Sequence, residues 1–132
     1  DEVLASVTDP RAGGTCLFVG TVRDHDGLGH GPDDGNRGVS HLDYSAHPQA
    51  LAALERVATE VADLFPGARL AAHHRVGHLT VGDLAVVVAA ASAHRDEAFR
   101  AARRLIDELK AGVPIWKHQS FTDGTEEWVG LP

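Results

Sequence analysis

The sequence predicts an α+β fold in a single domain spanning residues 1–132, with two main helices against a mostly antiparallel sheet. Two segments carry apolar residues at spacings of three and four, which indicates amphipathic helices. Shorter runs rich in β-branched and aromatic residues alternate with them and indicate strands. A chain of 132 residues can bury roughly two thirds of its unfolded surface without disulfides, so one domain suffices.

The first part of the chain is expected to hold two strands joined by a long loop. Thr15 to Arg23 follows two glycines and is rich in β-branched and aromatic residues, which is typical of a strand. Residues 24–38 contain five glycines and a proline and lack apolar periodicity, so they predict a flexible loop that is longer than most connections. A short strand is expected at Val39 to Ala46.

Helical periodicity marks two later segments. Pro48 suits the first turn of the first helix, which ends at Pro66. The second helix is expected from about Asp96 to Ala111, with acidic residues in its positive first turn and Pro114 just after its end. The expected buried faces are Leu51, Leu54, Val57, Val61 and Leu64 in the first helix, and Phe99, Ala102, Leu105, Ile106 and Leu109 in the second.

The remaining strands give the order β, β, α, β, β, α, β. Short strands are expected at Arg69 to Val76 and at Leu79 to Val81, and the apolar run Leu84 to Ala93 fits a buried strand. Pro114 to Phe121 is expected to be an edge strand, because a proline at its start lacks the N–H donor that a central strand needs. Helices packed against one mostly antiparallel sheet would accommodate this order.

The composition argues against several classes of protein. A net charge of -7 disfavours a broad nucleic-acid or anionic-membrane surface, since such surfaces need clustered Lys and Arg. The single cysteine, Cys16, excludes an internal disulfide and is expected to be a small core residue. The longest apolar run is too short to cross a bilayer, and the first residues lack the basic start of a signal peptide. We therefore expect a soluble, cytoplasmic protein.

The two lysines of the chain, Lys110 and Lys117, flank the segment 111–116, whereas the other basic side chains are ten arginines. A lysine ammonium loses its proton readily when it is desolvated or lies beside another cation, whereas arginine stays charged. The pair therefore indicates acid-base or nucleophilic chemistry at 110–117. The alternative is that both lysines are solvated surface charges.

Further basic residues stand near the expected ends of strands and helices. They are Arg23, the pair His74-Arg75, and the pair His94-Arg95 between an apolar strand and the second helix. Free backbone N–H groups at a helix start favour anions, and arginine adds a bidentate donor, so a phosphate or carboxylate is the expected ligand there. Alternatively, Arg75 and Arg95 form surface ion pairs with residues such as Asp83 or Asp96.

Metal and nucleophilic-serine chemistry lack support. The nine histidines do not show ligand spacing: His73 and His74 are adjacent in an expected strand and would point to opposite faces. Four others, His25, His30, His41 and His47, fall in or beside the expected loop. The chain has no G-x-S-x-G motif, and Cys16 has no basic residue beside it in the sequence that would activate the thiol. We expect no metal site.

Five sequence blocks occur in the order found in one enzyme family. They are Phe18-Val19-Gly20-Thr21-Val22-Arg23, His74-Arg75-Val76-Gly77, Ser92-Ala93-His94-Arg95 with Ala98-Phe99, Asp107-Glu108-Leu109-Lys110, and Val113-Pro114-Ile115-Trp116-Lys117. In this order they resemble the large, catalytic subunit of molybdopterin synthase. The resemblance extends from about Gly13 to Val129 and rests mainly on the last three blocks, whose combination is highly specific.

The resemblance implies a fold, an activity and partners. The family has an α/β hammerhead fold and acts as a sulfurtransferase in molybdenum cofactor biosynthesis. Sulfur comes from a thiocarboxylate on the C-terminal Gly-Gly tail of a small ubiquitin-like subunit. It is added to cyclic pyranopterin monophosphate, which forms the dithiolene of molybdopterin. The family enzyme is a heterotetramer with a homodimer of large subunits at its centre, and its reaction calls for no metal or organic cofactor.

The resemblance also assigns roles to residues by motif position. Lys110 and Lys117 match the catalytic lysines of the family. Arg23, His94 and Arg95 match residues that line its anionic pocket, and Arg75 matches a recurrent basic residue.

Two positions depart from the family pattern. Gln119 stands where the family usually carries a glutamate, which puts any acid-base role of that carboxylate in doubt, and His47 replaces a second aromatic residue. Two other functions stay open on the sequence alone. One is a noncatalytic domain that only docks a ubiquitin-like tail, and the other is a metal-binding protein that uses the loop histidines.

Overall fold

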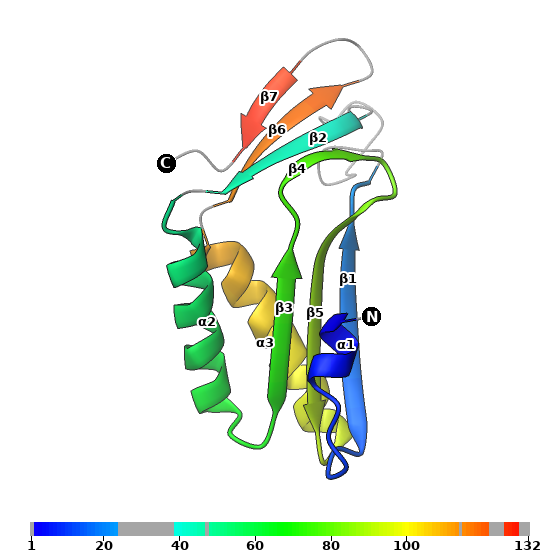
Figure 1. The fold of residues 1–132 in the computed structure, drawn as a ribbon, viewed down its shortest axis with the longest axis vertical. Coiled ribbons are helices and arrows are strands. Elements are labelled where there is room, and N and C mark those ends of the chain that lie inside the picture. Colours follow the sequence, from blue (N-terminus) through cyan, green and yellow to red (C-terminus); the bar gives the residue numbers. More distant parts are fainter. Residues whose placement is uncertain (1, 24–38, 47, 114, 122–125, 130–132) are drawn as a thin grey trace, which may run out of the picture.

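The computed structural model describes residues 2–23, 39–46, 48–113, 115–121 and 126–129. Within these ranges the chain forms three helices and seven strands (Figure 1). They are α1 (Glu2–Ser6), β1 (Gly14–Thr21), β2 (Val39–Ala46), α2 (Ala50–Leu64), β3 (Arg69–His74), β4 (Gly77–Thr80), β5 (Leu84–Ser92), α3 (Arg95–Gly112), β6 (Ile115–Phe121) and β7 (Glu126–Val129). The predicted order β, β, α, β, β, α, β counts two strands between the long helices, whereas the structure has three, β3, β4 and β5, which correspond to the three segments predicted there. The structure also adds α1 and β7 at the two ends. The flexible loop predicted at 24–38 lies outside the described residues.

The strands form two sheets rather than the single sheet expected. One sheet has the order β1-β5-β3 and the other the order β4-β2-β6-β7. All described strand pairs are antiparallel, so the predicted α+β class is confirmed. The four-stranded sheet lies across the upper end of the three-stranded sheet (Figure 1). The chain passes from one to the other at Gly77, whose φ of +99° lies in the left-handed region that favours glycine.

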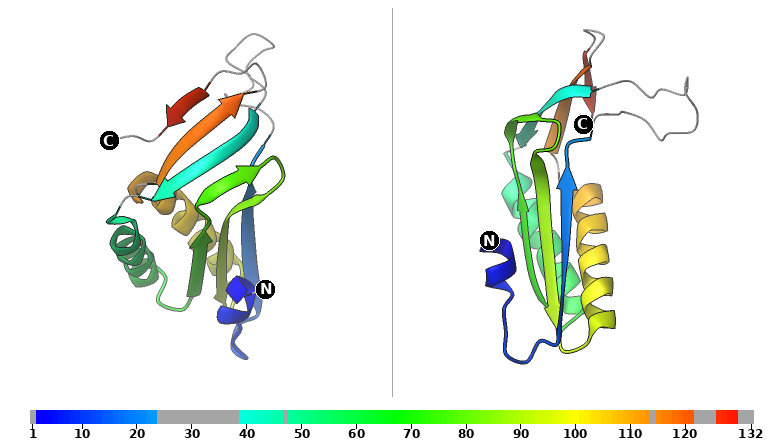
Figure 2. Two further views of the ribbon diagram at one scale, coloured as in Figure 1. Left: turned by 45° about the horizontal axis from the view of Figure 1, so that its top comes forward. Right: turned by 90° about the vertical axis from the view of Figure 1, so that its right-hand side faces the viewer.

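The three-stranded sheet is covered on both faces. Helices α2 and α3 pack on one face and α1 on the other (Figure 2). The central strand β5 shows the alternation this requires, because Val88 packs among side chains of α2 and α3 while Ala89 packs with Val7, just after α1. The buried strand predicted at Leu84 to Ala93 is thus confirmed. None of the helices in the described ranges has the length and apolar character needed to cross a membrane.

The buried faces of the long helices carry smaller side chains than the sequence predicts. The buried residues are Ala50, Ala53, Val57 and Val61 in α2, and Ala98, Ala101, Ala102, Leu105, Ile106 and Leu109 in α3. By contrast, Leu51, Leu64 and Phe99 are 68%, 55% and 61% exposed, so their predicted burial is wrong. Alanine lets the helices approach the sheet and each other closely, which leaves the larger side chains at the margins of the contact.

Strand β6 is internal, so the expectation of an edge strand is wrong. It pairs with β2 on one side and with β7 on the other. Pro114, on which that expectation rested, lies outside the described residues.

Strand β1, in contrast, lies at an edge of the three-stranded sheet. Its successive residues Leu17, Phe18 and Val19 are 41%, 39% and 40% exposed. Proteins normally protect an edge strand with charges, bulges or a covering element, so a run of exposed apolar residues here marks a contact surface. Neighbouring Cys16, expected in the core, packs beside Ala101 and Ala102 of α3 but is only partly buried.

Candidate active site

The two lysines lie on either side of the connection between α3 and β6. Lys110 is an exposed residue in the last turn of α3, where the helix dipole favours a cation. Lys117 is a residue of β6, and its backbone pairs with Tyr44 of β2 and with Val129 of β7. The side chain of Lys117 lies outside the described part of the structure. The helix end and the strand nevertheless bring both lysine positions to the end of the molecule where the two sheets meet (Figure 1).

Arg23 and Arg75 lie at the same end. Arg23 follows β1 by two residues, and Arg75 directly follows β3; both strands run toward the four-stranded sheet (Figure 1). The backbone N–H of Arg75 donates to the carbonyl oxygen of Ala85 over 2.8 Å, and its Nη1 donates to that of Leu84 over 3.3 Å. The guanidinium of Arg75 is therefore held by a backbone carbonyl rather than by the surface ion pair with Asp83 that was considered from the sequence.

Asp83 closes the turn between β4 and β5. Its carboxylate accepts hydrogen bonds from the backbone N–H and from the hydroxyl of Thr80, over 2.9 and 3.2 Å. The backbone N–H of Thr80 is the largest cause that lowers the pKa of Asp83, and the charges of Arg75 and His78 lower it further. Gly82 supplies the positive φ, +91°, that this turn needs. Asp83 thus shapes the turn and contributes negative potential near Arg75.

The junction before α3 is built by close backbone packing. A Cβ atom on Gly13 would lie 2.5 Å from the carbonyl oxygen of Ala93, and one on Gly14 would lie 3.1 Å from Cα of Arg95. The start of β1 can therefore approach this junction only because both residues are glycine. On the other side, the hydroxyl of the buried Ser92 donates to the carboxylate of Glu97 in the first turn of α3. The backbone at His94-Arg95 is held on both sides.

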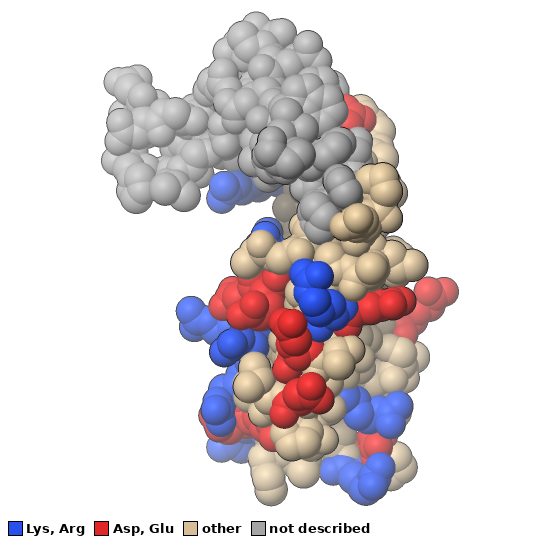
Figure 3. All heavy atoms as spheres, turned by 90° about the vertical axis from the view of Figure 1, so that its left-hand side faces the viewer, with Lys and Arg blue, Asp and Glu red and all other residues tan. Residues whose placement is uncertain are grey.

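The side chains of His94 and Arg95 are exposed at this rigid junction. Within the part of the chain that the structure describes, neither forms a hydrogen bond or an ion pair. Asp96, considered as a partner of Arg95, instead lies 3.5 Å from Arg100, one of three i,i+4 pairs along α3. Pairs like these intersperse acidic and basic side chains, as on the surface seen in Figure 3. Arg95 is left available for an external anion.

The six candidate residues fall into two groups at opposite ends of the chain's fold. Arg23, Arg75, Lys110 and Lys117 are at the upper end in Figure 1, whereas His94 and Arg95 begin α3 at the lower end. Fifteen residues separate Arg95 from Lys110, which corresponds to about 22 Å of helix. One copy of the chain does not gather all six residues in one pocket.

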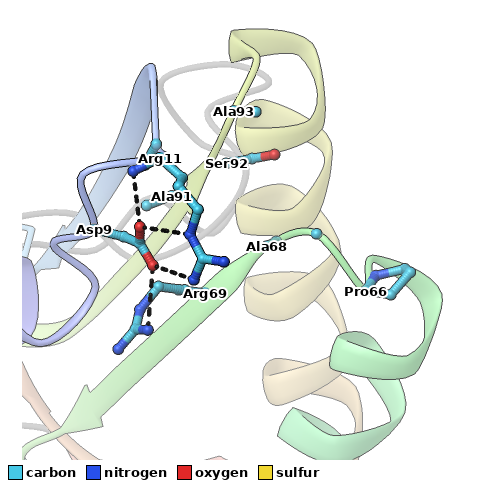
Figure 4. Close-up of a pocket in the computed structure, with 10 residues that line it drawn as sticks. Asp9, Arg11, Pro66, Ala68, Arg69, Ala91, Ser92 and Ala93 are labelled. Carbon is cyan, nitrogen blue, oxygen red and sulfur yellow. Dashed lines mark hydrogen bonds and ion pairs between the residues drawn. The ribbon is translucent and has the colours of Figure 1, made fainter.

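A pocket that the sequence analysis missed lies near the start of α3. Its volume is about 280 Å³, and it is lined by the α1–β1 connection, the α2–β3 connection with the start of β3, and the end of β5 with the residue after it (Figure 4). Asp9 accepts hydrogen bonds from the backbone and guanidinium of Arg11, at 2.8 to 3.2 Å, and lies 3.5 Å from Nη1 of Arg69. These hydrogen bonds from Arg11 are the main cause that lowers the pKa of Asp9. In the sequence, the turn-forming pattern Asp9-Pro10-Arg11 is the feature that could have drawn attention to this region.

In the described part of the chain, a histidine contacts a carboxylate at the other end of the molecule. Nδ1 of His78 lies 3.0 Å from the carboxylate of Asp43, its register partner on β2. Among the described residues, no three His, Cys, Asp or Glu side chains converge as metal ligands would. His25 and His30, considered as loop ligands, lie outside the described residues, and so does His47.

Known proteins with similar sequences fix the class. The model of the MoaE protein family matches residues 1–112. Molybdopterin synthase catalytic subunit 1 of Mycobacterium tuberculosis is 45% identical over 131 residues, which cover 98% of this chain and 83% of that protein. The molybdopterin synthase catalytic subunit of Bacillus subtilis is 36% identical, with coverages of 98% and 78%.

Solved structures agree with the sequence comparison. The crystal structure of molybdopterin synthase from Staphylococcus aureus superposes with a TM-score of 0.80 at 32% identity, covering 95% of this chain and 85% of that one. A MoaE protein from Burkholderia ambifaria gives a TM-score of 0.71 at 36% identity, with coverages of 92% and 74%. The chain belongs to the MoaE protein family. The resemblance to molybdopterin synthase catalytic subunits drawn from the sequence motifs is confirmed.

Proposed function

We propose that this chain is the catalytic subunit of a molybdopterin synthase, a sulfurtransferase of molybdenum cofactor biosynthesis. It transfers sulfur from the thiocarboxylated Gly-Gly tail of a small ubiquitin-like subunit to cyclic pyranopterin monophosphate and so forms the dithiolene of molybdopterin. The observation that carries the proposal is the 45% identity over 98% of the chain to a molybdopterin synthase catalytic subunit. The lysines and the basic residues identified above fall within this matched length.

The residues present suit a reaction between two anions. The substrate carries a phosphate and the donor a thiocarboxylate, so they repel each other unless cations hold both. We assign this role to Arg23, Arg75, His94 and Arg95. Lys110 and Lys117 then exchange protons while sulfur bonds to the substrate carbon and the cyclic phosphate opens. Water finally replaces sulfur on the acyl carbon of the tail, which leaves as a carboxylate.

A second copy of the chain would complete this pocket. If β1 pairs antiparallel with β1 of a second copy, the exposed Leu17, Phe18 and Val19 become buried near the two-fold axis. The two α3 helices then run antiparallel on the same face of one continuous sheet. This arrangement brings the start of one α3 near the end of the other, and hence Arg95 of one copy toward Lys110 of its partner. We therefore propose a homodimer within a heterotetramer.

The proposed reaction also bears on the extent of the domain and on the compartment. Both sheets contribute candidate residues, so we propose that residues 1–132 act as one domain. We place the reaction in the cytoplasm, because the free Cys16 and a thiocarboxylate donor suit a reducing environment.

The experiment combines the purified chain, a thiocarboxylated small subunit and cyclic pyranopterin monophosphate, and follows the thiocarboxylate by mass spectrometry. Consumption that needs both the chain and the substrate supports the enzyme. Binding of the small subunit with no consumption would instead support a docking domain. Wild-type chain heated beyond its unfolding transition serves as the control for uncatalysed hydrolysis.

A further inference from the structure

Tyr44 lies at the joint between the two sheets. It belongs to β2 of the four-stranded sheet, and its ring packs against Val22, Leu79 and Ala85, of which Val22 follows β1 and Ala85 lies in β5. Its ring also meets the imidazole of His74 at the end of β3, with a centroid distance of 5.0 Å and an interplanar angle of 73°. These contacts fix the orientation of the ring from both sheets.

The hydroxyl of Tyr44 is not used by this packing. No hydrogen bond to the phenol oxygen comes from any residue in the described ranges. No side-chain oxygen or nitrogen among those residues is both fully buried and unpaired, so the phenol oxygen reaches solvent. A tyrosine with a fixed ring and a free, accessible hydroxyl can hydrogen-bond an external ligand with little loss of conformational entropy.

The neighbours of Tyr44 are the candidate residues of the upper group. Its backbone register partner on β6 is Lys117. Its ring contact His74 precedes Arg75, and its packing partner Val22 precedes Arg23. Because a carbonyl only accepts, Nδ1–H of His74 donates to the carbonyl oxygen of Arg75 over 2.6 Å, which ties the imidazole to the backbone of that arginine. Tyr44 thus pairs through its backbone with Lys117, and its ring contacts the residues that precede Arg75 and Arg23.

We propose that Tyr44 contacts the substrate and that its phenol donates a hydrogen bond to a phosphate oxygen of the pyranopterin. This inference rests on the proposed function for the identity of the substrate. Burial of the ring raises the pKa of Tyr44, so the hydroxyl stays protonated and remains a donor throughout the neutral range. A neutral donor adds a hydrogen bond to the anion without adding a further charge to the cations of this group.

The composition allows a direct test, because Tyr44 is the only tyrosine in the chain. Growth with 3-fluorotyrosine places one fluorine label in the protein, and its single ¹⁹F resonance reports the phenol. Titration with cyclic pyranopterin monophosphate should shift this resonance and saturate at the same concentration as binding measured by calorimetry. Inorganic phosphate should shift it in the same direction at higher concentration, since the proposed contact is to the phosphate group.

The kinetic test uses Tyr44→Phe, which removes the hydroxyl and keeps the ring. We expect KM for the pyranopterin to rise at least about tenfold, the typical effect of removing a hydrogen bond to a charged group, with a smaller change in kcat. Leu79→Val is the matched control, because it loosens the same joint without touching the phenol. It should lower the thermal midpoint and leave KM close to the native value.

The outcomes separate this inference from the proposed function. Native KM in Tyr44→Phe, or a ¹⁹F resonance that ignores saturating substrate, overturns the role of Tyr44 while native turnover upholds the enzyme. An equal rise of KM in Leu79→Val also overturns it, since the effect would then come from the joint. A substrate-dependent ¹⁹F shift without any turnover supports the contact and counts against the enzyme.

Discussion

Two inactive variants should restore each other's activity if the active site is shared between copies. In the proposed dimer, each site takes Lys110 from one copy and Arg95 from its partner. Lys110→Ala removes a proton-transfer group, whose loss typically lowers the rate by ~10² to 10⁴. Arg95→Ala removes one partner of a charge-assisted contact, which typically weakens binding by about 2 to 5 kcal/mol. Each variant alone should therefore be nearly inactive.

The size of the recovery follows from the symmetry. In a two-fold dimer, a mixed pair carries one site with both substitutions and one site with neither. Random exchange of equal amounts makes about half of the dimers mixed, and half of the sites in those are intact, so about a quarter of native activity should return. The alternative is that Arg95 and Lys110 of the same copy serve one site, despite the roughly 22 Å of helix between them. Each site of a mixed dimer would then lack one of these two residues.

The assay needs a defined mixture. The two variants, each with a different affinity tag, are co-expressed, and the mixed dimer is isolated by sequential purification on both tags. It should show about half of the native thiocarboxylate turnover, because one of its two sites is intact. Co-expressed copies of one variant under both tags serve as the control. Turnover no higher than that of the separate variants would refute the shared site.

Three further outcomes are expected from the placement of single residues. Lys110→Arg and Lys117→Arg should each lose turnover while staying folded, because arginine keeps the charge but does not give up a proton; the loss should be greater for Lys110, and near-native rates in both would reduce the lysines to positioning charges. Phe18→Lys should give a monomer in light scattering and abolish turnover, whereas Leu51→Lys, at a more exposed apolar position on α2, should leave the dimer intact; a dimeric Phe18→Lys would rule out the β1 edge as the interface. Asp83→Asn should lower the thermal midpoint at pH 7. The folded state depresses the pKa of Asp83, so its stabilisation is present above the unfolded pKa, near 3.8, and is lost as the pH falls through the folded value; a gap between the native and variant midpoints that stays constant down to about pH 3 would contradict this.

Most of the elements were predictable because their segments carry strong local signals. Strand β2 has the predicted limits, Val39–Ala46, and α3 begins one residue before the predicted start at Asp96. The two missed elements, α1 and β7, have only five and four residues. Such short segments depend on tertiary contacts rather than on propensity; next to α1, for example, Val7 is fully buried against Ala89 and Ala91 of β5.

The faces of the elements were harder to predict than their limits. The apolar spacing predicted burial of the large side chains of Leu51, Leu64 and Phe99. The close contact between the helices and the sheet buries alanines instead. The split into two sheets and the internal position of β6 depend on strand pairing between distant segments, which a single sequence does not encode locally. The site residues themselves remain predictions.

Within the candidate site, the sequence grouped residues by charge but not by position. The predicted helix already separated Arg95 from Lys110 by about four turns, and the resemblance implied a homodimer, but only the structure showed the exposed edge of β1 on which a second copy could pair. Tyr44 gave no signal as a site residue, because its significance comes from a free hydroxyl at a joint between two sheets.

The most direct test of the proposed function follows sulfur from donor to product in one reaction. The purified chain is mixed with excess thiocarboxylated small subunit and limiting cyclic pyranopterin monophosphate, and both the carrier mass and the pterin product are measured over time. The proposed function predicts that two carriers change from thiocarboxylate to carboxylate for each dithiolene formed, and that none does so without substrate. Loss of thiocarboxylate with no sulfur in the pterin, or a stable complex in which the thiocarboxylate persists, would contradict it.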